Sequence, residues 1–189
     1  KKILFICKYP TILSENLATQ LSGQMNACKK LGYDVYYIEW NGSSFSLVSK
    51  SDNTKRKILI TYSNWNLEKY YHSLFFIDLY RSIEKITKEI NFDFFYIRNM
   101  PFFPPLNKAL MRISTHAEIV LEMPTYPIRQ ELISIGRFRR LVFKVTERYK
   151  MKIYANVSLF TVCGKQVNGK LYGKSAINIY NGIDVNLVP

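Results

Sequence analysis

Polar side chains that could bind a ligand follow several strand-like runs of the sequence. Glu122 lies between the apolar residues Leu121 and Met123, and a carboxylate at the end of a buried strand needs a polar partner. Arg98 ends another apolar run, and both it and Lys8 could hold a phosphate or sugar hydroxyls. We take nine residues in such loops as candidate ligand-binding residues: Lys8, Tyr9, Ser14, Glu15, Arg98, Asn99, Glu122, Thr125 and Tyr126.

These residue types also have structural explanations. Arg98 could simply be solvated at the end of its strand, and Glu122 could accept hydrogen bonds only from loop amides. Pro124 and Pro127 fix the shape of the loop that follows Glu122. The sequence alone leaves the binding and structural interpretations open.

The elements that must position these loops alternate between strand-like and helix-like patterns. Several of the strand-like runs are continuously apolar, as expected for parallel strands covered on both faces. Strands that alternate with helices predict an α/β fold with a mostly parallel sheet, whose ligands bind at the carboxyl ends of the strands. The predicted strands are residues 3–7, 35–38, 58–61, 94–97, 119–121, 159–162 and 176–179, and residues 41–57 are predicted to be a polar excursion.

Helical spacing fills most of the gaps between these runs. Ser14 is a suitable N-cap, Leu21 and Met25 lie on one face of the first helix, and Gly32 is a suitable stop. Apolar residues at helical spacing predict further helices over residues 79–90, 104–113 and 130–152.

The loops lack the usual motifs for metals and nucleotides. They contain no metal-ligand cluster, no Walker-type loop and no G-x-G-x-x-G sequence. The first loop has no glycine, although a dinucleotide-binding domain needs glycines there so that its backbone can approach the pyrophosphate. This argues against an ordinary dinucleotide-binding domain.

Charge is the unusual part of the composition. The 189 residues include 27 Lys and Arg against 14 Asp and Glu, a formal charge of +13. Such a surplus implies an anionic partner, which could be nucleic acid, an anionic membrane surface or a phosphorylated substrate. No apolar run is long enough to span a membrane, and three scattered cysteines favour reduced thiols in the cytoplasm.

Much of this charge falls between residues 129 and 152, where eight basic residues accompany two acidic ones. Helical spacing places a basic stripe beside an apolar stripe, and such a helix can lie at an anionic membrane surface. An ordinary amphipathic helix with solvated charges would show the same pattern. The basic stripe consists of Arg137, Arg140, Lys144 and Arg148.

Five motifs, in order along the chain, resemble the N-terminal domain of family-4-type GT-B glycosyltransferases. The most specific motif includes Asn181, Gly182 and Asp184, which in the family end the sheet just before the interdomain linker. The segment around Glu122 is similar to that of a subgroup that builds bacterial surface polysaccharides. The other motifs are residues 30–35 after the first helix, 93–98, 121–127 and 160–163.

The resemblance implies a Rossmann-like, mostly parallel seven-stranded sheet with helices on both faces, in one acceptor-binding domain over residues 1–189. A C-terminal domain absent from this chain would hold the nucleotide-sugar donor, so this chain alone would be inactive. The full enzyme would retain anomeric configuration, require no metal, and glycosylate a saccharide or a lipid-pyrophosphate-linked acceptor in cell-surface polysaccharide synthesis. It would be cytoplasmic and peripheral to the inner face of the plasma membrane.

The sequence also departs from the family. The first loop lacks the glycine pair that many members carry, and Glu122-Met123-Pro124 stands where many have a histidine. The histidines of this chain, His72 and His116, lie elsewhere, so no catalytic residue is assigned.

Two other functions compete with glycosyl transfer. A Rossmann-like domain can serve as a non-catalytic binding module, and a basic chain with 14 Tyr and 12 Phe could bind nucleic acid. Most of these aromatic residues fall inside the apolar runs, where they would form the core, which makes nucleic acid the weaker alternative.

Overall fold

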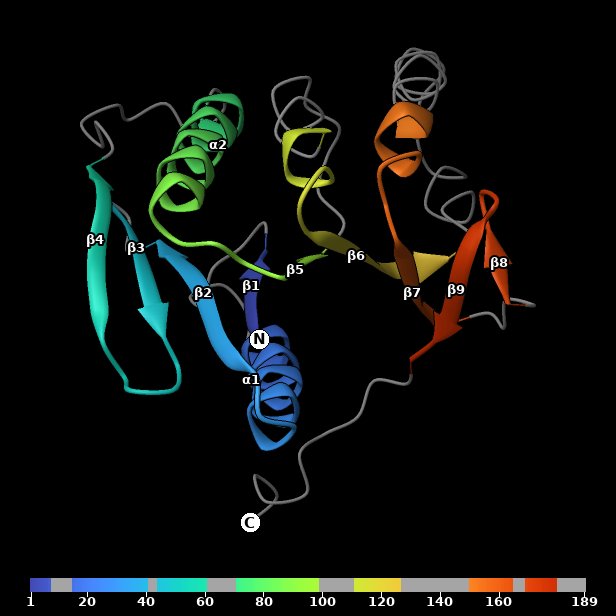
Figure 1. The fold of residues 1–189 in the computed structure, drawn as a ribbon, viewed down its shortest axis with the longest axis horizontal. Coiled ribbons are helices and arrows are strands. Elements are labelled where there is room, and N and C mark those ends of the chain that lie inside the picture. Colours follow the sequence, from blue (N-terminus) through green and yellow to red (C-terminus); the bar gives the residue numbers. More distant parts are fainter. Residues whose placement is uncertain are drawn as a thin grey trace. The chain divides into compact units, whose positions relative to one another are not determined.

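The computed structural model describes residues 1–7, 15–40, 44–60, 71–98, 111–126, 150–164 and 169–179. Within these ranges the chain forms nine strands and two long helices (Figure 1). It divides into two compact units, Lys1–Tyr96 and Ile97–Tyr180. The assignment of residues 1–189 to a single acceptor-binding domain stays a prediction.

The N-terminal unit contains a mixed sheet. Its strands follow the order β4-β3-β2-β1-β5, where β1 and β2 are parallel and both β3 ladders are antiparallel. The central strand β1 buries four consecutive apolar residues, as expected of a strand covered on both faces. The strands are β1 Lys2–Ile6, β2 Asp34–Trp40, β3 Ser44–Ser49, β4 Lys55–Ile60 and β5 Phe94–Arg98, whose last two residues belong to the second unit.

The helices α1 (Glu15–Lys30) and α2 (Tyr71–Glu89) cover opposite faces of this sheet (Figure 1). Leu21 and Met25 of α1 pack on the face of the sheet that carries Val35. α2 lies against β3 and β4. Its Glu89 pairs with Arg56 of β4, whose side chain lies on the face of the sheet opposite Val35. The apolar positions predicted for both helices are therefore the ones that pack.

Helix α1 ends as its sequence predicts. Gly32 adopts a φ of 84°, and its amide donates to the carbonyl of Lys29, at 3.0 Å. The amide of Tyr33 donates to the carbonyl of Cys28, at 3.1 Å. This is a Schellman motif, which satisfies carbonyls that the helix leaves without a partner and requires the positive φ that glycine tolerates.

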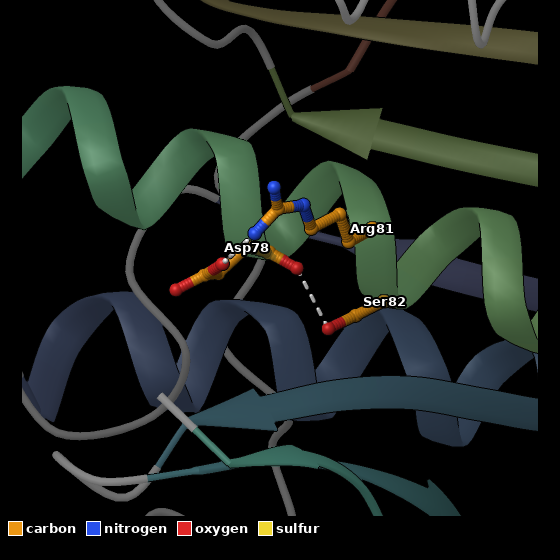
Figure 2. Close-up of polar contacts among 3 residues, drawn as sticks. All are labelled: Asp78, Arg81 and Ser82. Atoms are coloured by element: carbon orange, nitrogen blue, oxygen red, sulfur yellow. Dashed lines mark hydrogen bonds and ion pairs between the residues drawn. The ribbon is translucent and has the colours of Figure 1, made fainter. Parts of the chain in front are cut away.

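Helix α2 carries a buried serine whose hydroxyl is satisfied within the helix itself. Figure 2 shows that Ser82 turns back toward the preceding turn, where its hydroxyl donates to the carbonyl of Asp78 at 2.8 Å. The carboxylate of Asp78 pairs with Arg81 at 3.4 Å on the exposed side. Ser82 can therefore face the core without an unsatisfied polar group.

The structure corrects one prediction in the N-terminal unit. Residues 41–57, predicted to be a polar excursion, contain strand β3 and the start of β4. All six residues of β3 are buried, including Ser44, Ser46 and Ser49. Serine has no strong strand preference, so only pairing with both neighbouring strands places these residues in a sheet.

The C-terminal unit contains the strands β6 Glu118–Tyr126, β7 Leu159–Gly164, β8 Lys170–Leu171 and β9 Lys174–Asn178. They follow the order β6-β7-β9-β8, with parallel β6–β7 and β7–β9 ladders and an antiparallel β8–β9 hairpin. Residues 111–113 and 150–154 are helical. The core residues include Leu121, Met123, Phe160 and Val162.

The predicted α/β class and a mostly parallel, mixed sheet with helices are confirmed. The predicted number of strands is wrong. Seven strands were predicted, and with β3 and β8 the described part of the chain contains nine. Each predicted strand overlaps an observed one, and the helix predicted over 79–90 falls largely within α2. None of the helices in the described ranges is long and apolar enough to cross a bilayer.

Candidate functional site

Arg98 and Glu122 are the two predicted ligand-binding residues whose side chains the structure describes. Glu15 begins α1, and Thr125 and Tyr126 end β6, with their backbone described. Lys8, Tyr9, Ser14 and Asn99 lie outside the described residues, as do the basic stripe Arg137, Arg140, Lys144 and Arg148 and the junction residues Asn181, Gly182 and Asp184.

The structure brings Arg98 and Glu122, which are 24 residues apart in sequence, together as an ion pair. Arg98 Nη1 lies 3.3 Å from Glu122 Oε1, and both residues belong to the C-terminal unit. The Glu122 side chain is 0% exposed and the Arg98 side chain is 15% exposed. The guanidinium is thus the partner that solvent can reach.

Strand geometry explains how a charged pair comes to lie inside an apolar fold. Successive side chains in a strand point to opposite faces. In β6, Leu121 and Met123 are buried in the core, so Glu122 between them lies on the other face. In β5, the buried Ile97 is followed by Arg98, the last residue of the strand.

A bulge follows Glu122 in β6. The register of the β6–β7 ladder shifts between Met123 and Tyr126, because β6 has one more residue than β7 in this interval. Pro124 lies in this interval, and bulges are among the strand positions where proline, which has no N–H, is found. The predicted role of Pro124 in shaping this segment therefore has a specific form, a break in pairing directly after the Arg98–Glu122 pair.

Thr161 is a polar residue of this region that the sequence did not single out as a ligand-binding candidate. It is buried in β7 and is the register partner of Glu122, so the two side chains lie on the same face. Thr161 falls inside a predicted strand, and its position beside Glu122 follows from the parallel register. In the sequence, the signal for this residue was a threonine flanked by two apolar residues, Phe160 and Val162.

The arrangement is suited to binding rather than to proton transfer. The Glu122 carboxylate is buried and engaged by a guanidinium, whereas the guanidinium has five N–H groups and retains exposed surface. A planar cation held in this way can donate hydrogen bonds to phosphate or hydroxyl oxygens. Among the residues with described positions, no group of three or more His, Cys, Asp and Glu side chains could hold a metal ion.

A second polar cluster, in the N-terminal unit, has a structural role. Asp52 Oδ1 accepts hydrogen bonds from the amide of Thr54 at 3.0 Å and from its hydroxyl at 2.8 Å. Hydrogen bonds from Ser49 and Thr54 lower the pKa of Asp52 to about 2. Next to this turn, Lys50 Nζ lies 3.1 Å from Ser22 Oγ, and burial together with the charge of Lys29 lowers the pKa of Lys50. These contacts fix the β3–β4 turn against α1.

Comparisons of this chain with protein-family models, with curated proteins and with solved structures found no match.

Proposed function

We propose that this chain is the acceptor-binding domain of a retaining GT-B-type glycosyltransferase that acts in cell-surface polysaccharide synthesis. The observation that carries the proposal is the Arg98–Glu122 pair. The partly exposed guanidinium of Arg98, at the end of β5, is held by the fully buried carboxylate of Glu122 in β6. The α/β fold and the order of the sequence motifs also support it. The donor nucleotide-sugar would bind a further domain, and no metal is required.

The two residues have different roles in this proposal. Arg98 is the contact residue, because its exposed surface can reach an acceptor phosphate or hydroxyl oxygen. Glu122 is a positioning residue, because its carboxylate is buried and holds the guanidinium in one orientation. Asn99, Thr125 and Tyr126, which follow these residues in sequence, would complete the acceptor site, with Lys8, Tyr9, Ser14 and Glu15 from the first loop.

The proposal assigns the acceptor to a chemical class. A guanidinium is a strong partner for phosphate, which favours a lipid-pyrophosphate-linked saccharide over a neutral sugar. The enzyme would then work in the cytoplasm at the inner face of the plasma membrane, where such an acceptor is embedded.

Ligand binding by the isolated chain tests this proposal without transferase activity. Saturation-transfer NMR would compare neutral disaccharides, inorganic pyrophosphate and a short-chain prenyl-pyrophosphate-linked N-acetylglucosamine. We expect the prenyl-pyrophosphate saccharide to bind most tightly and Arg98→Met to weaken it at least about tenfold, the size of a lost charge-assisted hydrogen bond. Arg56→Met, which alters an exposed ion pair of the N-terminal unit, is the matched control and should bind like the parent.

Other results would point elsewhere. Tight binding of a single-stranded oligonucleotide that weakens steeply with salt, in the absence of saccharide binding, would favour the nucleic-acid alternative. Turnover of a nucleotide-sugar by this chain alone would contradict the assignment of the donor site to a further domain.

A further inference from the structure

The strands of the C-terminal unit have one face that forms its core. The ring of Tyr154, in the helical segment 150–154, packs edge-on against Phe160 of β7, with ring centroids 5.4 Å apart. Figure 1 shows this segment in orange and the segment with residues 111–113 in yellow, both on the same side of the strands. The buried residues on this face are Ile119, Leu121 and Met123 of β6, Phe160 and Val162 of β7, Leu171 of β8 and Ala176 of β9.

The register between these strands places a row of side chains on the opposite face. Val120 of β6 pairs with Leu159 of β7, and Leu159 pairs with Ser175 of β9. Ser175 in turn pairs with Lys170 of β8. Residues paired in this way point to the same face of a sheet, and each of these four is next to a buried core residue in its own strand. Val120 and Leu159 are partly exposed, and Ser175 and Lys170 are exposed.

Two further residues extend this row on the same face. Glu118 lies two residues before Val120 in β6, and Ile177 lies two residues after Ser175 in β9. Glu118 is exposed, and Ile177 is 49% exposed although β9 has a strand on either side. Parallel strands are usually covered on both faces, so an isoleucine this exposed indicates a surface that a partner covers. We name this surface the open face, and it consists of Glu118, Val120, Leu159, Lys170, Ser175 and Ile177.

The two charged residues of the open face have opposite signs and lie at opposite ends of it. Glu118 belongs to β6 and Lys170 to β8, three strands away, which is about 14 Å at the usual strand spacing. Neither side chain forms an ion pair with another described residue of the chain. The charges of the open face therefore cancel, although the whole chain carries +13.

This arrangement of charged and apolar residues is complementary to itself. In a two-fold symmetric dimer both copies use the same surface, so the residues at its two ends contact each other across the interface. When two open faces stack about a two-fold axis that passes near Leu159, Glu118 of each copy lies opposite Lys170 of the other. At the usual spacings of about 4.8 Å between strands and about 6.6 Å between alternate residues of a strand, the same axis brings Val120 opposite Ile177.

We propose that the open face is the interface of a homodimer of this chain. Its apolar residues would meet at the centre and its charged residues would pair at the rim, as in other protein interfaces. An anionic partner is not favoured here, because Glu118 balances Lys170. Glu122 lies on the same side of β6 but is 0% exposed, so the interface is separate from the proposed acceptor contact and does not depend on glycosyl transfer. Six residues are fewer than the roughly 20–30 per partner of a stable interface, so we expect a dissociation constant on the order of 10–100 μM.

Sedimentation equilibrium over a range of protein concentrations tests this proposal. The ionic strength is about 0.15 M, where salt screens the repulsion between two copies of charge +13. We expect the parent chain to show a monomer–dimer equilibrium and Ile177→Asp to weaken the dimer at least about tenfold, because each copy loses a buried apolar contact. Leu31→Asp is the matched control, since Leu31 is 76% exposed in the N-terminal unit, and it should associate like the parent. The far-ultraviolet circular dichroism spectra of both variants should be unchanged.

A charge swap tests whether the two ends of the open face meet across the interface. Lys170→Glu places like charges opposite each other at both ends of the dimer, and so does Glu118→Lys, so each should weaken association at least about fivefold. The double variant Glu118→Lys with Lys170→Glu restores opposite charges, and its dissociation constant should return to within about twofold of that of the parent.

Three results would overturn the proposal. The first is a parent chain that stays monomeric up to millimolar concentration. The second is an equal loss of association in Leu31→Asp and Ile177→Asp, because added charge alone would then explain the effect. The third is a double charge variant that associates no better than the single variants, which would mean that Glu118 and Lys170 do not meet and that another surface or partner is involved.

Discussion

Arg56–Glu89 and Arg98–Glu122 are arginine–glutamate ion pairs, one in each unit, and they differ in their surroundings more than in their chemistry. In the N-terminal unit Arg56 Nη1 lies 2.6 Å from Glu89 Oε2, with side chains 54% and 39% exposed. In the C-terminal unit the Arg98–Glu122 atoms are 3.3 Å apart, with side chains 15% and 0% exposed. The pair with the shorter distance, Arg56–Glu89, contributes less to stability, because water screens its charges and can solvate either partner alone.

The two units also differ in charge. Residues 1–96 carry 13 basic and 9 acidic residues, whereas residues 97–180 carry 14 basic and 4 acidic ones. In the N-terminal unit, Lys55 of β4 pairs with Glu39 of β2, the strand on the other side of β3, and Arg81 pairs with Asp78 in the preceding turn of α2. The C-terminal unit therefore holds most of the surplus of basic over acidic residues. The proposed site for an anionic acceptor, at Arg98, lies in the same unit.

The largest expected effect is on stability, from removing one partner of the buried pair. Glu122→Ala removes the buried carboxylate that pairs with the largely buried guanidinium of Arg98, and we expect a loss of about 3–5 kcal/mol in the free energy of unfolding. Glu89→Ala should cost less than about 1 kcal/mol, because its partner stays solvated. Urea unfolding of both variants measures the difference, and equal losses would remove the distinction between the two pairs.

Replacing both partners of the buried pair should restore much of that stability. The double variant Arg98→Met with Glu122→Leu buries no charge, and such replacements are often neutral or stabilising, so we expect an unfolding free energy within about 2 kcal/mol of the parent. The same variant should bind no lipid-pyrophosphate saccharide. A double variant as unstable as Glu122→Ala would mean that the pair is needed for folding itself.

Salt should affect the coupling energies of the two ion pairs differently. A double-mutant cycle on Arg56 and Glu89 should give a coupling energy of about 0.5 kcal/mol that falls toward zero in molar salt. The corresponding coupling between Arg98 and Glu122 should change little, since salt screens buried charges weakly. A salt-insensitive coupling for the exposed pair would contradict this account.

The smallest effect concerns Asp52, which is exposed and held by hydrogen bonds rather than by an ion pair. Its pKa of about 2 lies below the ordinary value near 3.9, so its contribution to stability is present above about pH 4 and is lost as the pH falls toward 2. Titration of the Asp52 carboxyl by NMR should give the lowered pKa. In Thr54→Val, which lacks the hydroxyl donor, the pKa should rise toward the ordinary value.

The sequence predicted those parts of the fold that depend on local pattern. Continuous apolar runs located β1 and the other predicted strands, and Gly32 located the end of α1. Strand β3 was missed because Ser44 and Ser46 are buried only through their pairing with both neighbouring strands. The short strand β8 was missed because Tyr172 is an uncommon residue before glycine in a hairpin turn.

The candidate site was predicted only as separate residues. Arg98 and Glu122 were each selected because they are polar residues at the ends of apolar runs. Their pairing depends on which strands are neighbours and on register, which a single sequence does not specify. The division of roles between a buried carboxylate and a partly exposed guanidinium likewise depends on burial in the folded chain.

The central claim is that Arg98 presents its guanidinium to an acceptor while Glu122 holds it in place. The most direct measurement follows the side-chain Nε–H resonance of Arg98, assigned with Arg98→Lys, during titration with the prenyl-pyrophosphate-linked N-acetylglucosamine. We predict a saturable shift of this resonance in the parent, with the Arg56 resonance unchanged. An Arg98 resonance that stays fixed while the ligand binds would place the acceptor elsewhere and contradict the account.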